Sequence, residues 1–421
     1  MMKKTNKKRG FTIIELTIVV AVIAILSAVL IPTFAAIIKK SRESADQQAV
    51  RSMNTALAAE TITDDLNIFD VFEVLEDNGM DGQNYKSLAK DKAFFYDAEL
   101  KRILYVDTAT DTAVYPEEYA GRTNNGKWTS LSGEIETVKP DDYTSSATTV
   151  AVESGKQLAY VIDQINDNKS DATTIELAGT IDMMGAELNL EPLNKNETLT
   201  IKGSETDPVV IKNATAVEGK TTYKKLTPGQ NNTYNLALFT RVYAGAKVTL
   251  ENVVIENVNM KETHVGNCAF LVGILDGTLE LNNVTIKNSS IIGGSSVGAL
   301  VGNMTKTGKI VANDVTIENV DLKCVVGRVG KLIGNMSTAA TPTTNTAEIT
   351  MTNCTTGIYF CEQNTGSGLG LIDGNLWGWR YEADGNVEEA KARAYFENTL
   401  AGNLASNSTE TSYTTLAALV A

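Results

Sequence analysis

The sequence has few of the side chains on which enzymes commonly rely. It contains one histidine, His264, and four cysteines, none of them in a Cys-x-x-Cys pair. A lone histidine in a polar loop is usually solvated. Residues 151–380 hold no Asp-Asp pair and few arginines, Arg241 and Arg328 among them, so they lack the clustered acids of a polysaccharide hydrolase and an obvious lyase base. Asp107 and Asp111 could line a calcium loop, but Asp-x-x-x-Asp is a weak signal. We therefore expect no catalytic residues, no metal and no cofactor.

Basic and aromatic residues are also scarce. The net charge is −14, and loss of the basic first ten residues would make the chain more acidic still. Nucleic-acid binding rests on Lys and Arg neutralising phosphates, so we expect no nucleic-acid partner. No aromatic stripe marks a sugar platform, and Trp377, Trp379 and Tyr381 can equally seal a core or bind a ligand.

The cysteines leave two interpretations open. Outside the cell they allow one or two disulfides, whose pairing the sequence does not reveal. Cys354, at an apolar repeat position, also fits a small buried hydrophobic residue. The four are Cys268, Cys324, Cys354 and Cys361.

One long apolar run is present, at the N-terminus. Residues 7–15 read Lys-Lys-Arg-Gly-Phe-Thr-Ile-Ile-Glu, and the apolar stretch continues with few breaks to Ala36. Residues 11–31 alone match the roughly 20 residues that span a bilayer. Glu15 lies inside this segment, where a carboxylate is costly and is usually kept for a function.

This order of residues resembles the processing and assembly signal of type IV pilins and pseudopilins. The resemblance implies that a prepilin peptidase cuts after Gly10 and that the new terminal residue, Phe11, is methylated. It also implies that Glu15 meets the terminal amine of a neighbouring subunit, since an ion pair replaces two uncompensated charges in an apolar medium. Pro32 lies where such proteins often carry a helix-kinking proline.

Two simpler interpretations compete with this one. A secretory signal has an apolar core of about 7 to 15 residues, shorter than this run, although residues 34–36 could serve as its cleavage site. A plain membrane anchor fits the length but leaves Glu15 unexplained. In each case the basic N-terminal cluster stays cytoplasmic and the rest lies outside. For a pilin, the chain would sit in the cytoplasmic membrane and then reach the cell surface or a pilus or pseudopilus.

The segments that follow predict a pilin-like plan. After a leader over residues 1–10, helical signals persist over 11–60, which is about 75 Å of helix. Residues 61–133 predict a small α+β head, with a helix at 68–78 and a hairpin of strands at 93–97 and 102–107. A polar stretch with Pro140, residues 134–150, predicts a linker.

Beyond this stretch the chain repeats itself. The segment 248–260 recurs at equal spacing as 279–291 and 310–322, with a period of roughly 30 residues that is typical of stacked units. Val248, Leu250, Val253, Ile255, Val258 and Met260 are predicted to point inward. Bends are predicted at Asn252, Asn257, Asn283 and Asn288. Asp314 and Asp321, and the Asn-x-Ser/Thr sites Asn303 and Asn335, are also interpreted as bend residues.

The predicted fold class is thus α+β followed by all-β. The repeats over 151–380 resemble right-handed parallel β-helices of the pectin-lyase-like class, with an antiparallel β-sandwich as the competitor. A helix over 155–168, just before a first strand at 174, would cap one end. A helix over 387–400, within a cap and tail at 381–421, would cap the other.

These features lead to one functional hypothesis and two rivals. We expect a cell-surface pilin-like subunit, minor or at the tip because the β-helix is bulky, that displays a binding or adhesion domain. Its partners would be prepilin peptidase, other pilin subunits, the cytoplasmic membrane and an extracellular glycan or protein. The rivals are an envelope-tethered polysaccharide lyase or hydrolase and a pseudopilin of a type II-like secretion system.

Overall fold

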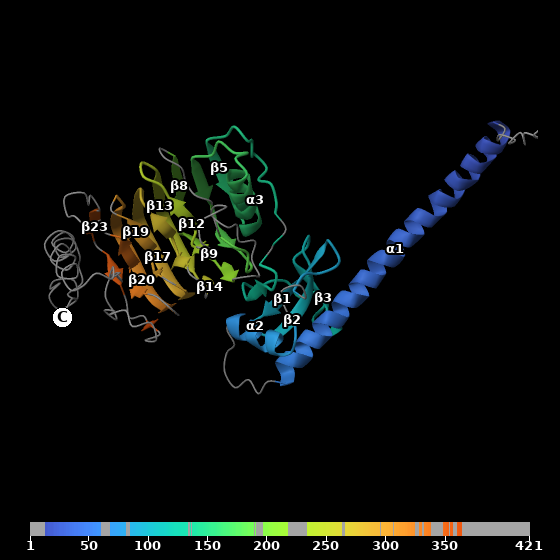
Figure 1. Ribbon diagram of the computed structural model, residues 1–421, viewed down its shortest axis with the longest axis horizontal. Helices are drawn as coiled ribbons and strands as arrows, with labels where there is room; N and C mark the ends of the chain where they lie inside the picture. The colour runs from blue at the N-terminus through green and yellow to red at the C-terminus, as the bar shows by residue number, and fades with distance from the viewer. Residues whose placement is uncertain are drawn as a thin grey trace, which may run out of the picture.

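The protein consists of a long helix, a small antiparallel sheet and a parallel β-solenoid of about four turns (Figure 1). The predicted fold class is therefore confirmed at this level. The computed structural model describes residues 13–59, 68–80, 85–133, 135, 137–188, 190, 197–217, 234–262, 266–294, 296–305, 307–324, 328–330, 332–337, 348–352, 354–356 and 360–363.

Helix α1 (Ile13–Ala59) extends well beyond the rest of the molecule (Figure 1). Its 47 residues correspond to about 70 Å at 1.5 Å per residue. Pro32 lies inside the helix without ending it, since a proline removes only one backbone hydrogen bond. The C-terminal part packs on the head, where Val50, Met53 and Leu57 are buried.

The head consists of α2 (Ile68–Asp77), β1 (Lys92–Asp97), β2 (Arg102–Asp107), β3 (Thr112–Tyr115), a short 3₁₀ helix η1 (Glu117–Tyr119) and β4 (Trp128–Ser130). The strands form an antiparallel sheet in the order β3-β2-β1-β4. The predicted helix and hairpin are confirmed. Phe72 and Leu75 of α2 share a core with α1 and with Phe94 and Tyr105 of the sheet.

The solenoid begins with β5 (Thr149–Val152), helix α3 (Gly155–Asn166), β6 (Thr174–Leu177), β7 (Thr180–Asp182), β8 (Thr198–Lys202), β9 (Val209–Lys212), β10 (Thr215–Val217), β11 (Tyr234–Leu236) and β12 (Phe239–Val242). It continues with β13 (Lys247–Glu256), β14 (Asn259–Glu262), β15 (Gly266–Ala269), β16 (Val272–Leu275), β17 (Thr278–Gly293), β18 (Ser296–Gly298) and β19 (Val301–Thr305). The last described strands are β20 (Lys309–Cys324), β21 (Arg328–Gly330), β22 (Ile333–Ser337), β23 (Glu348–Thr352), β24 (Thr355–Thr356) and β25 (Phe360–Gln363).

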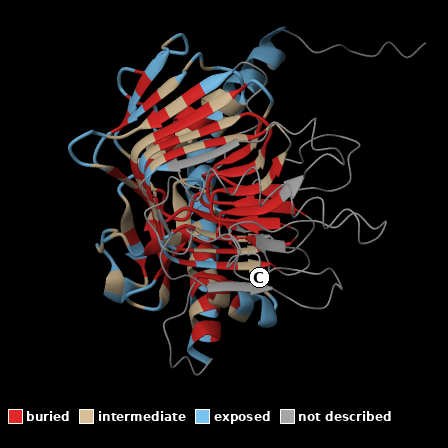
Figure 2. Cartoon of the chain, turned by 90° about the vertical axis from the view of Figure 1, so that its left-hand side faces the viewer, coloured by how far each residue is buried: buried red, intermediate tan, exposed pale blue. Residues whose placement is uncertain are grey.

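The sequence repeats lie directly above one another in the solenoid. Val248 of β13 pairs with Leu279 of β17, which pairs with Ile310 of β20, and all these strand pairs are parallel. The six side chains predicted to point inward are all buried. Figure 2 shows buried residues along the solenoid strands, and these residues belong to one hydrophobic core. An antiparallel β-sandwich is therefore the wrong alternative for this region.

Asparagines form the bends between flat strand segments. Asn252, Asn257, Asn283 and Asn288 all have φ between 50° and 57°, the left-handed region that asparagine tolerates better than most residues. The bend prediction is confirmed for them. Their side chains also join successive coils: Nδ2 of Asn283 donates to Oδ1 of Asn252 at 2.9 Å.

Three other bend predictions are wrong. Asp314 does occupy a bend, at φ 55°, but Asp321 of the same strand β20 lacks the positive φ of the bend residues. Asn303 of β19 and Asn335 of β22 lack it too, and Nδ2 of Asn335 donates to Oδ1 of Asn303 at 2.8 Å. Asparagine suits both places, because amides stacked in neighbouring strands also hydrogen-bond between coils.

Helix α3 covers the first end of the solenoid core. Ser154 caps it by accepting from the backbone N–H of Gln157 at 3.3 Å, and Leu158, Val161 and Ile162 pack into the core. The predicted position before the first strand is wrong, since β5 precedes α3 and pairs with β6. The helix still covers apolar side chains that would otherwise face water.

The head packs directly on the solenoid. The backbone N–H of Ser130 in β4 donates to the carbonyl of Met184 at 2.7 Å, and the Met184 side chain is buried with Phe95 and Trp128 of the head. The polar stretch at 134–150 runs along this junction: Ile135 contacts the cores on both sides, and Tyr143 is buried in the solenoid core.

Candidate functional site

The most exposed apolar surface of the described chain is the first half of α1. The exposed fractions are 85% for Ile13, 58% for Phe34 and 49% for Ile38. From Leu16 onward, α1 is long and apolar enough to cross a membrane, judged by length and composition. An apolar surface of this size requires lipid or other protein around it.

A buried carboxylate fastens the second half of α1 to the head. Asp46 accepts hydrogen bonds from the Ser87 hydroxyl at 2.6 Å, from the N–H groups of Leu88 at 2.9 Å and Ala89 at 3.2 Å, and from the Tyr105 hydroxyl at 2.8 Å. Burial, together with the bond to Asp46, raises the pKa of Tyr105, so this hydroxyl stays protonated as a donor.

A second contact joins α1 to β2 at Ile103, beyond the residues of β2 that pair with β3. Oδ1 of Asn54 accepts from the N–H of Ile103 at 2.8 Å, and Nδ2 donates to the Ile103 carbonyl at 2.9 Å. The amide thereby replaces a neighbouring strand. Arg51, one turn earlier, donates to the Tyr115 hydroxyl. The point where α1 leaves the head is thus fixed by several directional bonds.

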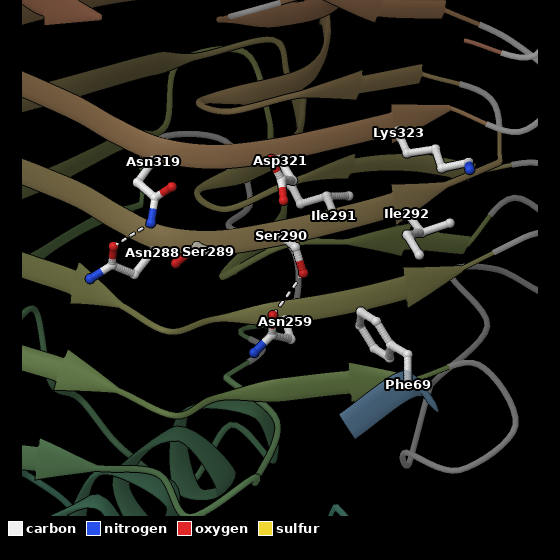
Figure 3. Close-up of a pocket in the computed structure, with 10 residues that line it drawn as sticks. All are labelled: Phe69, Asn259, Asn288, Ser289, Ser290, Ile291, Ile292, Asn319, Asp321 and Lys323. Atoms are coloured by element: carbon white, nitrogen blue, oxygen red, sulfur yellow. Dashed lines mark hydrogen bonds between the residues drawn. The ribbon is translucent and has the colours of Figure 1, made fainter. Parts of the chain in front are cut away.

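A groove of about 420 Å³ lies where α2 meets the solenoid (Figure 3). Phe69 of α2 stands on one side, and β14, β17 and β20 supply the other side chains. Those are Asn259, Asn288, Ser289, Ser290, Ile291, Ile292, Asn319, Asp321 and Lys323. Two hydrogen bonds order the polar ones: Ser290 Oγ donates to Asn259 Oδ1 at 2.7 Å, and Asn319 Nδ2 donates to Asn288 Oδ1 at 2.7 Å.

Comparison with protein families gives one match. Residues 5–31 match the prokaryotic N-terminal methylation motif. The motif implies processing by a prepilin peptidase and assembly with other pilins, and with the apolar helix it suggests membrane anchoring before assembly. Searches of curated proteins and of solved structures gave no match, so the likeness of the solenoid to pectin-lyase-like proteins has no further support.

The matched motif includes all three residues that the sequence singles out for processing and assembly. Gly10 and Phe11 lie outside the described residues. Glu15 lies in the first turns of α1, within its exposed apolar half, and Thr17 nearby donates its hydroxyl to the Ile13 carbonyl at 2.7 Å. Their roles therefore stay predictions of the motif.

The residues considered for chemistry are scattered. Asp107 bonds Lys92 at 2.8 Å, which holds the pKa of the Asp107 carboxyl below its usual value, and Asp111 pairs with Lys156 at 3.0 Å. Among the described residues no group of three or more His, Cys, Asp or Glu side chains could hold a metal. His264 lies outside the described residues, as do Trp377, Trp379, Tyr381 and the predicted helix at 387–400.

Three described cysteines and Arg241 lie in surroundings that indicate a structural role. Cys354 is buried and makes no disulfide, as its apolar repeat position indicated, and burial raises the pKa of its thiol. Cys268 and Cys324 are buried too. Arg241 bonds Asp276 at 2.7 Å and lies over the Tyr243 ring, which fits a role in holding the solenoid surface.

Sequence reasoning missed Asp46 and the groove. A signal for Asp46 was present, because it shares one helix face with Val50, Met53 and Leu57. A charged residue in line with three buried apolar ones indicates a buried, bonded carboxylate. Nothing local could reveal the groove, since Phe69 and Asp321 are far apart in the sequence.

Proposed function

We propose that this protein is a pilin-like surface subunit that assembles through its N-terminal helix and displays the solenoid as a binding domain. The observation that carries the proposal is the uncovered apolar half of α1, which coincides with the methylation motif. In the membrane, lipid would cover it; in a fibre, the helices of neighbouring subunits would do so.

The attachment of the solenoid supports display rather than loose tethering. The head bonds to α1 through Asp46 and Asn54 and to the solenoid through Ser130 and Met184. A subunit built in this way would hold its solenoid at a fixed angle to the fibre. Because the solenoid is much larger than the head, we propose a minor or tip position, where it would not crowd its neighbours.

We further propose that the solenoid binds its ligand without catalysis. What supports this is the composition of residues 151–380, which hold no Asp-Asp pair and few arginines. A binding role needs an exposed surface, which the outer faces of stacked strands provide over several coils.

The assembly half of the proposal is tested at Glu15. In the variant Glu15→Ala, the chain should still be processed but should be lost from sheared surface fibres, because the neighbouring terminal amine would have no buried counter-ion. The measurement is immunoblotting of sheared and cell-bound fractions, with N-terminal sequencing to score cleavage.

Thr17→Ala is the matched control in the same part of α1. It removes one hydroxyl bonded within the helix and should assemble normally. Normal incorporation of Glu15→Ala would overturn the assembly proposal.

A further inference from the structure

The groove between α2 and the solenoid combines ordered polar side chains with an apolar corner. Asn259, Ser290 and Asp321 lie side by side on three neighbouring strands, as their pairing registers show. Parallel strands are spaced about 4.8 Å apart, so these three side chains form a regular column. Figure 3 shows them on the same face as Asn319, with Phe69 and Ile292 beside them.

The hydrogen bonds among the groove residues leave fixed acceptors facing the groove beside some donors. Asn319 uses one amide N–H on Asn288, which leaves its Oδ1 and a second N–H, and Ser290 uses its proton on Asn259, which leaves its oxygen lone pairs. Among the described residues, no hydrogen bond or ion pair engages the Asp321 carboxylate, and this residue is exposed. Acceptors and donors that are held in place favour a ligand whose groups both donate and accept, as hydroxyls do.

The charges in the groove narrow the class of ligand further. Asp321 and Lys323 carry opposite charges, so the lining residues have no net charge that would favour a polyanion or a polycation. The apolar corner is formed by the partly exposed Ile292 and by the edge of Phe69, which is 6% exposed and has the Lys261 ammonium 5.9 Å from its ring centroid. Such a corner suits the C–H face of a sugar ring, and about 420 Å³ falls in the range of small-ligand sites.

We propose that this groove binds a neutral oligosaccharide, with Asp321, Ser290 and Asn319 accepting from its hydroxyls and the Phe69–Ile292 corner contacting a ring face. The proposal rests on the proposed display function and gives it a ligand class and a site. The site exists only because the head packs on the solenoid, since the solenoid alone lacks Phe69.

The test is calorimetric titration of the chain without its leader (residues 11–421), in a detergent without a sugar headgroup. The neutral probes are cellotetraose, maltotetraose and chitotetraose; the others are trigalacturonate, a lysine-rich peptide and calcium chloride. We expect at least one neutral probe to bind. Asp321→Ala and Ser290→Ala should each raise its Kd by on the order of tenfold or more, because each removes a hydrogen-bond acceptor.

Glu318→Ala is the matched control, an exposed acid on the same strand that does not line the groove, and it should leave the Kd unchanged. The proposal is overturned if no neutral probe binds, if only an acidic, peptide or calcium probe binds, or if both groove variants bind like the parent chain. The Glu15→Ala chain should bind the neutral probe normally, so failure of assembly and failure of the groove are read separately.

Discussion

The head and the solenoid satisfy their polar groups in different ways. In the head, one buried carboxylate, Asp97, accepts from Trp128 Nε1 at 2.9 Å, from Arg122 Nε at 3.0 Å and from two backbone N–H groups, and Asp46 collects four donors in the same manner. In the solenoid, single amide bonds recur from coil to coil, as between Asn313 and Asn282 at 3.0 Å.

The difference teaches where each part is vulnerable. A single head substitution can leave several buried donors without an acceptor at once. The solenoid distributes similar bonds over stacked units, and each coil depends only on its neighbours. Substitutions should therefore have large effects at a few head positions and moderate effects at many solenoid positions.

The largest effect is expected for Asp46→Ala. The variant deprives four donors of their acceptor and should lower the free energy of docking α1 on the head by about 3 kcal/mol. Hydrogen exchange of residues 46–59, measured on the detergent-solubilised chain, reports this undocking. Glu43→Ala removes an ion pair to Lys39 on the same helix and should change little. Equal exchange in the two variants would show that Asp46 is not the fastening point.

A smaller effect is expected for Asn283→Ala in the solenoid. Alanine at φ 53° costs about 1 kcal/mol, and loss of the bond to Asn252 costs about 1 kcal/mol more. Asn283→Gly loses the bond but not the conformation, so it should be the milder variant in denaturant unfolding. If alanine were milder than glycine, the left-handed bend would not be the reason for asparagine at this position.

The smallest effects are expected for one surface ion pair in each part, where the head and the solenoid should respond alike. Lys92 lowers the pKa of Asp107 in the head, and Lys247 lowers the pKa of Glu280 in the solenoid. A lowered folded-state pKa stabilises the protein above the ordinary carboxyl value, and this contribution is lost as the pH falls through the folded-state value.

Asp107→Asn and Glu280→Gln should therefore each reduce the loss of thermal stability between about pH 5 and pH 3. Each change should be below about 1 kcal/mol, since both pairs are partly exposed. Melting curves across this range measure it. A much larger change in the head variant would extend the contrast to surface ion pairs.

The elements that the sequence predicted well are those whose information is local or periodic. The hairpin of β1 and β2 follows from two short apolar runs around a turn, and the stacking of Val248, Leu279 and Ile310 follows from the repeat spacing. Asp321 was misassigned to a bend because it is the same residue type as Asp314. Only the backbone conformation, left-handed at Asp314 and not at Asp321, decides which of them turns the chain.

The candidate groove could not be predicted, because it joins parts of the chain that no local pattern relates. Phe69 belongs to the head and Ser290 to the middle of the solenoid, and the contact between Ser130 and Met184 helps to set their distance. Such a contact depends on the complementary shapes of the head and the solenoid, which exist only after both have folded.

By itself the sequence determined the methylation motif, the apolar helix that carries it and the coil-by-coil register of the solenoid. Each of these is written in consecutive or evenly spaced residues, where hydrophobic pattern and backbone preference act directly. Tertiary structure alone decided how Asp46 fixes the helix, how the head meets the solenoid and what faces the groove. Those outcomes depend on burial and hydrogen bonding between distant segments, whose free energy exists only after both have folded.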